Sequence, residues 1–223
     1  MAKIVFISDT HISLHNVEVP KCDILIHSGD IASRGSFEEI VRELDVLADK
    51  LEKADNIVLV AGNHDKFADS NESLMKELCE DRDIYYLRDS EIELCGLRVY
   101  GSPYSPTFPR KGIWGFNADR GKEIKAIWDK IPEGIDILVT HGPPYGVLDE
   151  CPNYWTGKYE KVGCKDLLDK VLKIKPQVHS FGHIHESYGQ KEFNGIKFVN
   201  ASQMDGDYKL VNKPIILDIN KRK

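Results

Sequence analysis

Five short apolar runs in this 223-residue sequence are each followed by a cluster of aspartate, asparagine or histidine. The clusters are Asp9-Thr10-His11, Gly29-Asp30, Gly62-Asn63-His64-Asp65, His141-Gly142 and Gly182-His183-Ile184-His185. Because ligands of α/β sheets bind in the crevice outside the carboxyl ends of the strands, we expect these clusters to converge in space.

The residue types in the clusters indicate a metal site with oxygen and imidazole ligands. Asp, Asn and His supply these donors and no cysteine lies among them, which suits manganese, iron, zinc or magnesium better than a sulfur-rich structural zinc site. Asp9 and His11 stand one residue apart, as do His183 and His185, so each pair points to one side of an extended turn, as a chelating pair requires. The adjoining glycines allow the backbone to turn sharply beside a ligand.

The elements that must position these clusters are buried strands that alternate with helices. The five apolar runs, at 3–8, 23–28, 56–61, 135–140 and 178–181, predict strands buried on both faces. Helices are predicted at 36–53, with Ser36 as cap and Glu39 as its capping-box partner, and at 70–80. Two further helices are predicted at 117–130, capped by Asn117, and at 165–174.

The remaining apolar segments add strands that need not be parallel to the others. These strands are predicted at 84–87, 91–94, 97–101, 188–193, 197–200 and 214–219. A tight hairpin is predicted at Cys95-Gly96, and a long loop at 142–163. The whole pattern predicts a mixed α/β fold in one domain over 1–223, a four-layer α-β-β-α sandwich of two mixed sheets flanked by helices.

The composition argues against duplex nucleic acid as a partner. The chain has 30 Lys and Arg against 36 Asp and Glu, a formal net charge of −6, whereas binding to the phosphate backbone requires many basic side chains. The five cysteines are scattered and odd in number, as free thiols in a reducing compartment are. The amino-terminal apolar run of 4–7 is too short for a signal peptide or a membrane span. We therefore expect a cytoplasmic protein without a membrane partner.

Taken together and in this order, D-x-H, G-D, G-N-H-D, H-G and G-H-x-H resemble the motifs of the calcineurin-like metallophosphoesterase superfamily. They extend from residue 9 to residue 185 and so cover most of the chain. The finer pattern is similar to the small metallophosphoesterase-domain-containing (MPPED) group. The segments that carry this similarity are S-D-T-H (8–11), L-I-H-S-G-D (25–30), Y-G-S-P (100–103), W-G-F-N (114–117), T-H-G-P-P (140–144) and F-G-H-I-H-E (181–186).

The resemblance implies two divalent metal ions, with manganese expected in vitro and iron, zinc or magnesium as alternatives. It implies one ion held by Asp9, His11 and His185, a second held by Asn63, His141 and His183, and Asp30 as the bridge between them. The implied reaction is attack on phosphorus by a metal-bridging hydroxide, without a covalent phospho-enzyme. His64 is implied to face the scissile phosphate as an acid or charge stabiliser, paired to Asp65. The Gly29-Asp30 motif departs from the family where Ile31 replaces an acidic residue.

Substrate contacts are predicted in and beside the glycine-rich segment near residue 114. Trp114 or Phe116 is able to stack on a nucleobase, worth ~1–3 kcal/mol per base, and Arg110 or Asn117 to hold a phosphate or a base edge. The alternative is that both aromatic side chains close the core and that Asn117 only caps its helix. His27, within a strand, is expected to pack or to support a ligand rather than to bind metal.

The function predicted from these features is a phosphodiesterase that hydrolyses small nucleotide phosphodiesters, including cyclic nucleotides. Two alternatives remain open: a phosphomonoesterase that acts on proteins or small molecules, and a nucleotide-binding scaffold with little turnover. The expected partner is thus a small phosphate ester or nucleotide.

Overall fold

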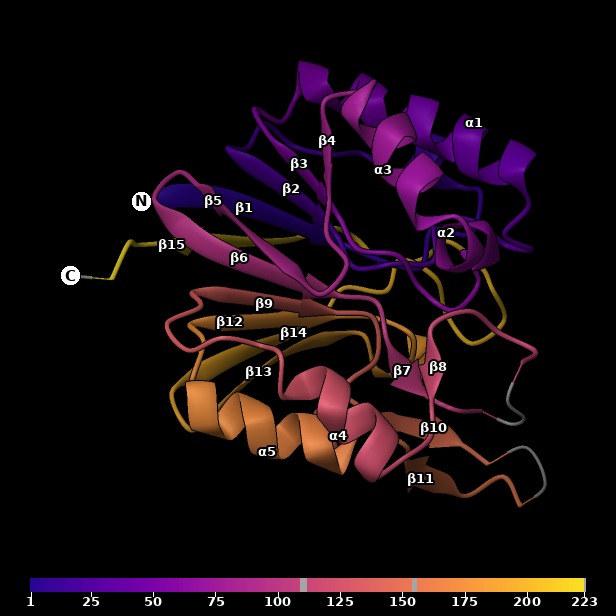
Figure 1. Ribbon diagram of the computed structural model, residues 1–223, viewed down its shortest axis with the longest axis vertical. Helices are drawn as coiled ribbons and strands as arrows, with labels where there is room; N and C mark the ends of the chain where they lie inside the picture. Colours follow the sequence, from indigo (N-terminus) through magenta and orange to yellow (C-terminus); the bar gives the residue numbers. More distant parts are fainter. Residues whose placement is uncertain (109–111, 154–155, 223) are drawn as a thin grey trace.

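In the computed structural model, which describes residues 1–108, 112–153 and 156–222, two β-sheets lie face to face between two layers of helices (Figure 1). The first sheet has the order β15-β1-β2-β3-β4. Its strands are β15 (Ile215–Ile219), β1 (Ala2–Ile7), β2 (Ile24–His27), β3 (Ile57–Leu59) and β4 (Ile84–Tyr86). Strands β1 to β4 are parallel and β15 is antiparallel to β1, so the sheet is mixed.

The second sheet is also mixed, with the order β13-β14-β12-β9-β6-β5. Its strands are β13 (Gly189–Phe193), β14 (Ile196–Asn200), β12 (Val178–Phe181), β9 (Ile137–Thr140), β6 (Leu97–Ser102) and β5 (Ser90–Leu94). The four central strands are parallel, and both edge strands are antiparallel to their neighbours. The predicted β5–β6 hairpin is confirmed, and its turn residues Cys95 and Gly96 have φ of 52° and 75°, as a type I′ turn requires.

Helices cover the outer face of each sheet. Helices α1 (Phe37–Ala48), α2 (Lys66–Ser70) and α3 (Glu72–Glu80) lie over the first sheet, and α4 (Lys122–Trp128) and α5 (Lys165–Ile174) over the second. Short 3₁₀ turns occur at η1 (Leu14–Asn16), η2 (Asp49–Glu52) and η3 (His185–Ser187). No helix in the described part of the chain combines the length and the apolar character needed to cross a bilayer.

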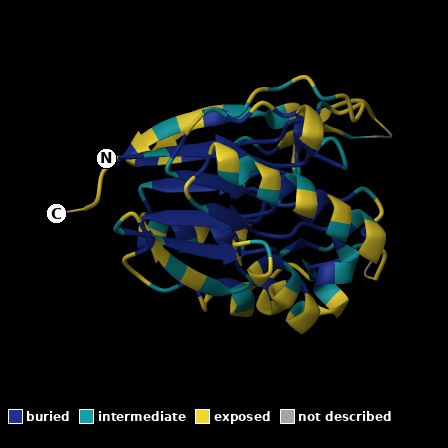
Figure 2. Cartoon of the chain, turned by 90° about the horizontal axis from the view of Figure 1, so that it is seen from above, coloured by how far each residue is buried: buried dark blue, intermediate teal, exposed yellow. Residues whose placement is uncertain are grey.

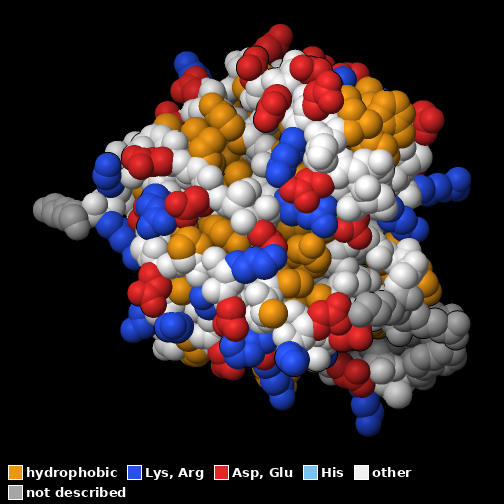
Figure 3. Space-filling model, viewed as in Figure 1, with side chains coloured by type: hydrophobic (Ala, Val, Ile, Leu, Met, Phe, Trp, Pro, Cys, Tyr) orange, Lys and Arg blue, Asp and Glu red, His pale blue; other side chains and the backbone are white. Residues whose placement is uncertain are grey.

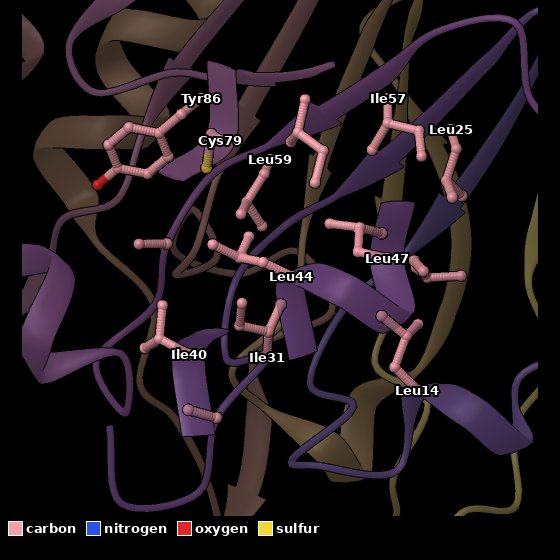
Figure 4. Close-up of a cluster of buried hydrophobic side chains, with 14 of the residues drawn as sticks. Leu14, Leu25, Ile31, Ile40, Leu44, Leu47, Ile57, Leu59, Cys79 and Tyr86 are labelled. Atoms are coloured by element: carbon pink, nitrogen blue, oxygen red, sulfur yellow. The ribbon is translucent and has the colours of Figure 1, made fainter. Parts of the chain in front are cut away.

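Three apolar clusters fill the three interfaces between the four layers. One packs α1 and α3 against the first sheet and contains Ile40, Leu44 and Leu59 (Figure 4). The second lies between the sheets and contains Phe6, Val58 and Val139. The third packs α4 and α5 against the second sheet. The central strands are therefore buried while the outward faces of the helices are exposed (Figure 2), and the predicted four-layer α/β sandwich is confirmed.

Three local predictions are corrected. The helix predicted at 117–130 begins only at Lys122, because β8 (Asn117–Ala118) pairs with β7 (Ser105–Pro106). Asn117 is therefore not a helix cap. The segment 142–163 contains a hairpin, β10 (Glu150–Pro152) with β11 (Tyr159–Lys161). The Glu39 carboxylate does not return to Ser36 but accepts from the N–H groups of residues 33–35.

Candidate metal centre

The polar clusters that follow β1, β2, β3, β9 and β12 meet where the carboxyl ends of the two sheets adjoin. β1, β2 and β3 belong to the first sheet and β9 and β12 to the second, so the centre lies across both. Asp9, Asp30 and His141 are at most 2% exposed. The predicted convergence of the five strand ends therefore occurs.

The first group of potential ligands consists of Asp9, His11 and His185. One donor atom from each lies within 4.8 Å of the others. His185 Nε2 is 3.4 Å from Asp9 Oδ1 and 3.3 Å from His11 Nε2. Both nitrogens point at the same space, which is the arrangement that a shared ion needs.

The second group consists of Asp30, His141 and His183, again within 4.8 Å of one another, with Asn63 beside them. His141 Nε2 is 2.9 Å from Asn63 Oδ1 and 3.3 Å from Asp30 Oδ2. The same Asp30 Oδ2 is 3.9 Å from His11 Nε2 of the first group. One carboxylate thus faces both groups of donors.

Backbone carbonyls fix the orientation of three of these histidines. The Nδ1 atoms of His11, His141 and His185 lie 3.1, 3.0 and 3.0 Å from the carbonyl oxygens of Ala32, Ser28 and Asp205. A carbonyl oxygen accepts only, so each Nδ1 donates its proton and a neutral imidazole leaves Nε2 as a free lone pair toward the centre. This is how metal-binding histidines are usually held, and the donor set of carboxylate, imidazole and amide oxygen fits divalent ions.

The backbone at the centre adopts rare conformations. Asp9, His11, Asp30 and His183 have φ of 50°, 37°, 59° and 68°. Such strain in residues with a side chain persists only where the surroundings enforce it, and it gathers at functional sites. Gly182 and Gly62 provide the remaining room, because a Cβ at Gly182 would overlap the Asp9 carboxylate and one at Gly62 the Asp30 carboxylate.

Burial and mutual charge set the protonation of the centre. Burial raises the pKa of Asp9 and of Asp30, but His185 and His141 respectively bring both below the ordinary value. Burial lowers the pKa of His141, whereas the Asp30 carboxylate more than offsets this and raises it to about 9. Burial lowers the pKa of His183 to about 3. Asp9 and Asp30 are therefore ionised at neutral pH, while His141 holds a proton in the metal-free chain.

His64 lies at the edge of the centre, 9% exposed, between two other rings. Its ring centroid is 4.7 Å from that of His11 and 4.3 Å from that of Trp114. His64 Nδ1 is 2.6 Å from the Ser33 carbonyl oxygen, which leaves Nε2 free. His64 also forms a third group of donor atoms with His11 and Asp30, within 4.8 Å of one another.

The predicted pairing of His64 with Asp65 is corrected. The Asp65 carboxylate accepts from the backbone N–H groups of Asp30, Ala32 and Gly62, at 2.9, 2.9 and 2.8 Å. Asp65 therefore ties together the two loops that carry Asp30 and Asn63, while the Ser33 carbonyl orients the imidazole of His64 in its place. His27 accepts from Gly29 N at Nδ1 and lies 3.1 Å from Thr10 Oγ1 through Nε2, so it supports the loops from within the core.

A cavity of about 370 Å³ opens onto the centre. Asp30, Asn63 and His64 lie in its wall together with Trp114, Arg120 and Tyr208. Of the predicted substrate contacts, Trp114 is thus in the cavity, and Arg110 lies outside the described residues. Phe116 is 1% exposed and packs against Tyr104 beneath the Arg88 guanidinium, so the prediction of a substrate contact is corrected in favour of the core. Asn117 donates to Ser105 Oγ and joins β8 to β7.

Comparison with known proteins agrees with this arrangement. The sequence model of the family described as calcineurin-like phosphoesterase matches residues 2–187. The chain belongs to the calcineurin-like phosphoesterase family. Members of this family hydrolyse phosphoric esters and normally bind divalent metal ions, and the His and Asp groups described above are its candidate metal ligands.

The family relatives include human metallophosphoesterase domain-containing protein 1, which is 37% identical over 97% of this chain and 71% of its own length. A UPF0046 protein of Caenorhabditis elegans is 33% identical over 99% of this chain and 76% of its own length. The crystal structure of TT1561 from Thermus thermophilus has a TM-score of 0.61 at 13% identity, over 90% of this chain and 88% of that one, so it shares the fold. The resemblance to the metallophosphoesterase-domain-containing group is thereby confirmed.

Two residues of the cavity wall lie outside the five sequence motifs and were not predicted as site residues. Tyr208 follows the turn residues Asp205-Gly206-Asp207, and Arg120 lies before α4. An Asp-Gly pair predicts a turn but says nothing about which strand end the turn will meet.

Proposed function

We propose that this chain is a dinuclear metal-dependent phosphodiesterase that hydrolyses small nucleotide phosphodiesters, including cyclic nucleotides. The observation that supports it most strongly is the pair of donor groups that the Asp30 carboxylate faces, at one end of a 370 Å³ cavity. A cavity of this size suits a small ligand.

In this proposal Asp9, His11 and His185 hold one ion, Asn63, His141 and His183 hold the other, and Asp30 binds both. Two such ions, when bound, activate water for attack on phosphorus and neutralise charge on the phosphoryl oxygens. The carbonyls of Ala32, Ser28 and Asp205 keep three of the imidazoles in the binding tautomer. Manganese is the ion with which we expect activity in vitro.

His64 is proposed as the residue that transfers a proton. Its Nδ1–H is held by the Ser33 carbonyl, so a proton on Nε2 of the imidazolium is directed away from that bond. Donation of this proton to the leaving oxygen is worth ~10²–10⁴-fold in rate. His64 is chosen over Asp65 because the Asp65 carboxylate is occupied by three backbone N–H groups.

The cavity wall favours a singly charged ester with a flat group. Trp114 lies beside His64 and offers a surface on which a nucleobase can stack. Among the described lining residues Arg120 is the one Lys or Arg, and its guanidinium already donates to the carbonyls of Val162 and Gly163. A phosphodiester, with one negative charge, needs less compensation than a dianionic monoester.

The charge pattern on the face of the molecule in Figure 3 agrees with a small-molecule substrate. Acidic and basic side chains are interspersed on the face shown in Figure 3, without a continuous basic stripe. A duplex-binding protein concentrates basic residues on one face, where they contact the phosphate backbone.

The test is hydrolysis of bis-p-nitrophenyl phosphate beside p-nitrophenyl phosphate, with Mn²⁺ and with chelator. We expect the diester to be the better substrate, chelator to abolish turnover, and His64→Ala to lose ~10²–10⁴-fold in kcat at unchanged metal content. His15→Ala, at an exposed histidine in η1, is the matched control. Faster turnover of the monoester would favour a phosphomonoesterase, and no turnover with any divalent metal would refute the enzyme in favour of a binding protein.

A further inference from the structure

The loop of residues 205–209 lies against the metal centre and presents a tyrosine to it. The Tyr208 ring centroid is 4.9 Å from that of His11 and 5.0 Å from that of His185, two histidines of the first donor group. It is 6.3 Å from that of His64, whose ring also lies beside His11. Tyr208 and His64 therefore flank the same part of the cavity.

The loop is built in a way that fixes this tyrosine. Asp205 Oδ1 accepts from the backbone N–H groups of Asp207 and Lys209, at 3.0 and 2.9 Å, and Asp205 N donates to the Lys209 carbonyl. The carbonyl oxygen of the same Asp205 accepts from His185 Nδ1. The turn that carries Tyr208 is thus joined directly to a residue of the first donor group.

Tyr208 also has an unfavourable backbone conformation, with φ of 59°. A bulky residue at positive φ is an outlier, and glycine or asparagine would fit the turn with less strain. Tyr208 shares this conformation with Asp9, His11, Asp30 and His183 of the centre. Its side chain is 54% exposed, so burial of the ring does not account for the strain.

Basic side chains that could compensate an anionic phosphoryl group are scarce in the described part of the cavity wall. Among the described lining residues the one Lys or Arg is Arg120, which is engaged by two carbonyls. No hydrogen bond engages the Tyr208 hydroxyl within the described part of the chain. A tyrosine hydroxyl can donate to an anionic oxygen, and such a bond is stronger than one between neutral groups.

We propose that Tyr208 is a further catalytic residue whose hydroxyl donates a hydrogen bond to the phosphoryl group bound at the centre. In this role Tyr208 and His64 hold the phosphoryl group from two sides, and the Asp205 turn maintains the position of the hydroxyl. The inference rests on the proposed metal centre, and it assigns to the chain a substrate contact that none of the five motifs contains.

The test is isothermal titration of inorganic phosphate into the Mn²⁺-loaded chain, with metal content measured on the same samples. Tyr208→Phe keeps the ring and removes the hydroxyl. We expect it to raise the dissociation constant for phosphate about tenfold, the effect of losing one hydrogen bond to a charged group, at unchanged manganese content. Tyr159→Phe, at a 66% exposed tyrosine of β11, is the matched control and should bind as the wild type does.

Equal affinity of Tyr208→Phe and Tyr159→Phe would overturn the role of the hydroxyl while leaving the metal centre in place. A wild-type chain that binds phosphate no better with Mn²⁺ than with chelator would overturn the centre itself, and the inference with it.

A second variant tests the turn. Asp205→Ala removes the acceptor for two backbone N–H groups and should weaken phosphate binding when Tyr208 is present. In the Tyr208→Phe background it should cause no further loss of affinity, because both changes act through the same hydroxyl. Additive losses would contradict this coupling. Asp205→Asn keeps an acceptor oxygen and should restore the affinity.

Discussion

Metal binding by this chain should become tighter as the pH rises from 6.5 to 8, because His141 must lose a proton before its imidazole can hold an ion. Burial lowers the pKa of His141, but the Asp30 carboxylate 3.3 Å away raises it to about 9 in the metal-free chain. Each pH unit below that value reduces the neutral fraction about tenfold, so affinity should rise about thirtyfold over 1.5 units. Burial likewise lowers the pKa of His185, but the Asp9 carboxylate raises it above its ordinary value. Loss of the His185 proton therefore also strengthens metal binding as the pH rises.

The assay is isothermal titration of Mn²⁺ into metal-free chain at pH 6.5, 7.2 and 8, in two buffers of different ionisation enthalpy. The difference between buffers counts the protons released, and we expect about one from His141 for each centre filled. His15→Gln, at an exposed histidine remote from the cavity, should behave as the wild type does. An affinity that is constant between pH 6.5 and 8, with no proton release, would refute the coupling of His141 to Asp30.

Three substitutions test the packing around the centre. Asp30→Ala should lose both ions, because its carboxylate faces both donor groups; metal content equal to that of the wild type would contradict this assignment. Gly182→Ala should lower the free energy of unfolding by about 1–3 kcal/mol in urea denaturation, because its Cβ would overlap the Asp9 carboxylate and force a shift; an unchanged midpoint would refute the close fit. Asp65→Leu should lower the free energy of unfolding by about 1–3 kcal/mol for each buried N–H group that is left without an acceptor. The same urea denaturation measures this loss, and an unchanged free energy of unfolding would contradict the role of Asp65 in joining the two loops.

The strands that carry the centre were predictable because their signal is local. An apolar run buried on both faces and followed by a turn residue identifies a strand without knowledge of its neighbours, and the predicted 178–181 and 165–174 match β12 and α5 in full. The direction of those strands then places their carboxyl ends at one edge. The convergence of Asp9 and Asp30 follows from these two facts, whereas His141 joins them because the two sheets lie face to face.

Elements that depend on distant partners were not predictable in this way. Strands β7 and β8 have two residues each, too few for any alternation of apolar and polar side chains, and they exist because residues 105–106 and 117–118 meet. Phe116 and Trp114 stand two residues apart in one loop, yet one is buried beneath Arg88 and the other lies in the cavity. No property of their side chains distinguishes them in the sequence.

The partners of the ionisable groups were the least accessible to prediction. The resemblance implied a pair of His64 and Asp65, but the Asp65 carboxylate accepts instead from backbone N–H groups of residues 30 and 32 and of Gly62 in its own loop. Tyr208 reaches the centre because the Asp205 carbonyl binds His185, a contact between residues 20 positions apart. Local sequence encodes the turn at 205–209 but not the surface on which it lies.

The dinuclear centre is tested most directly by an anomalous difference map from crystals of the Mn²⁺-loaded chain. We expect two peaks, separated by about 3.5–4 Å as in other two-metal sites, with Asp30 between them, His11 and His185 beside one, and His141 and His183 beside the other. A single peak, or a second peak away from Asp30, would contradict the dinuclear centre.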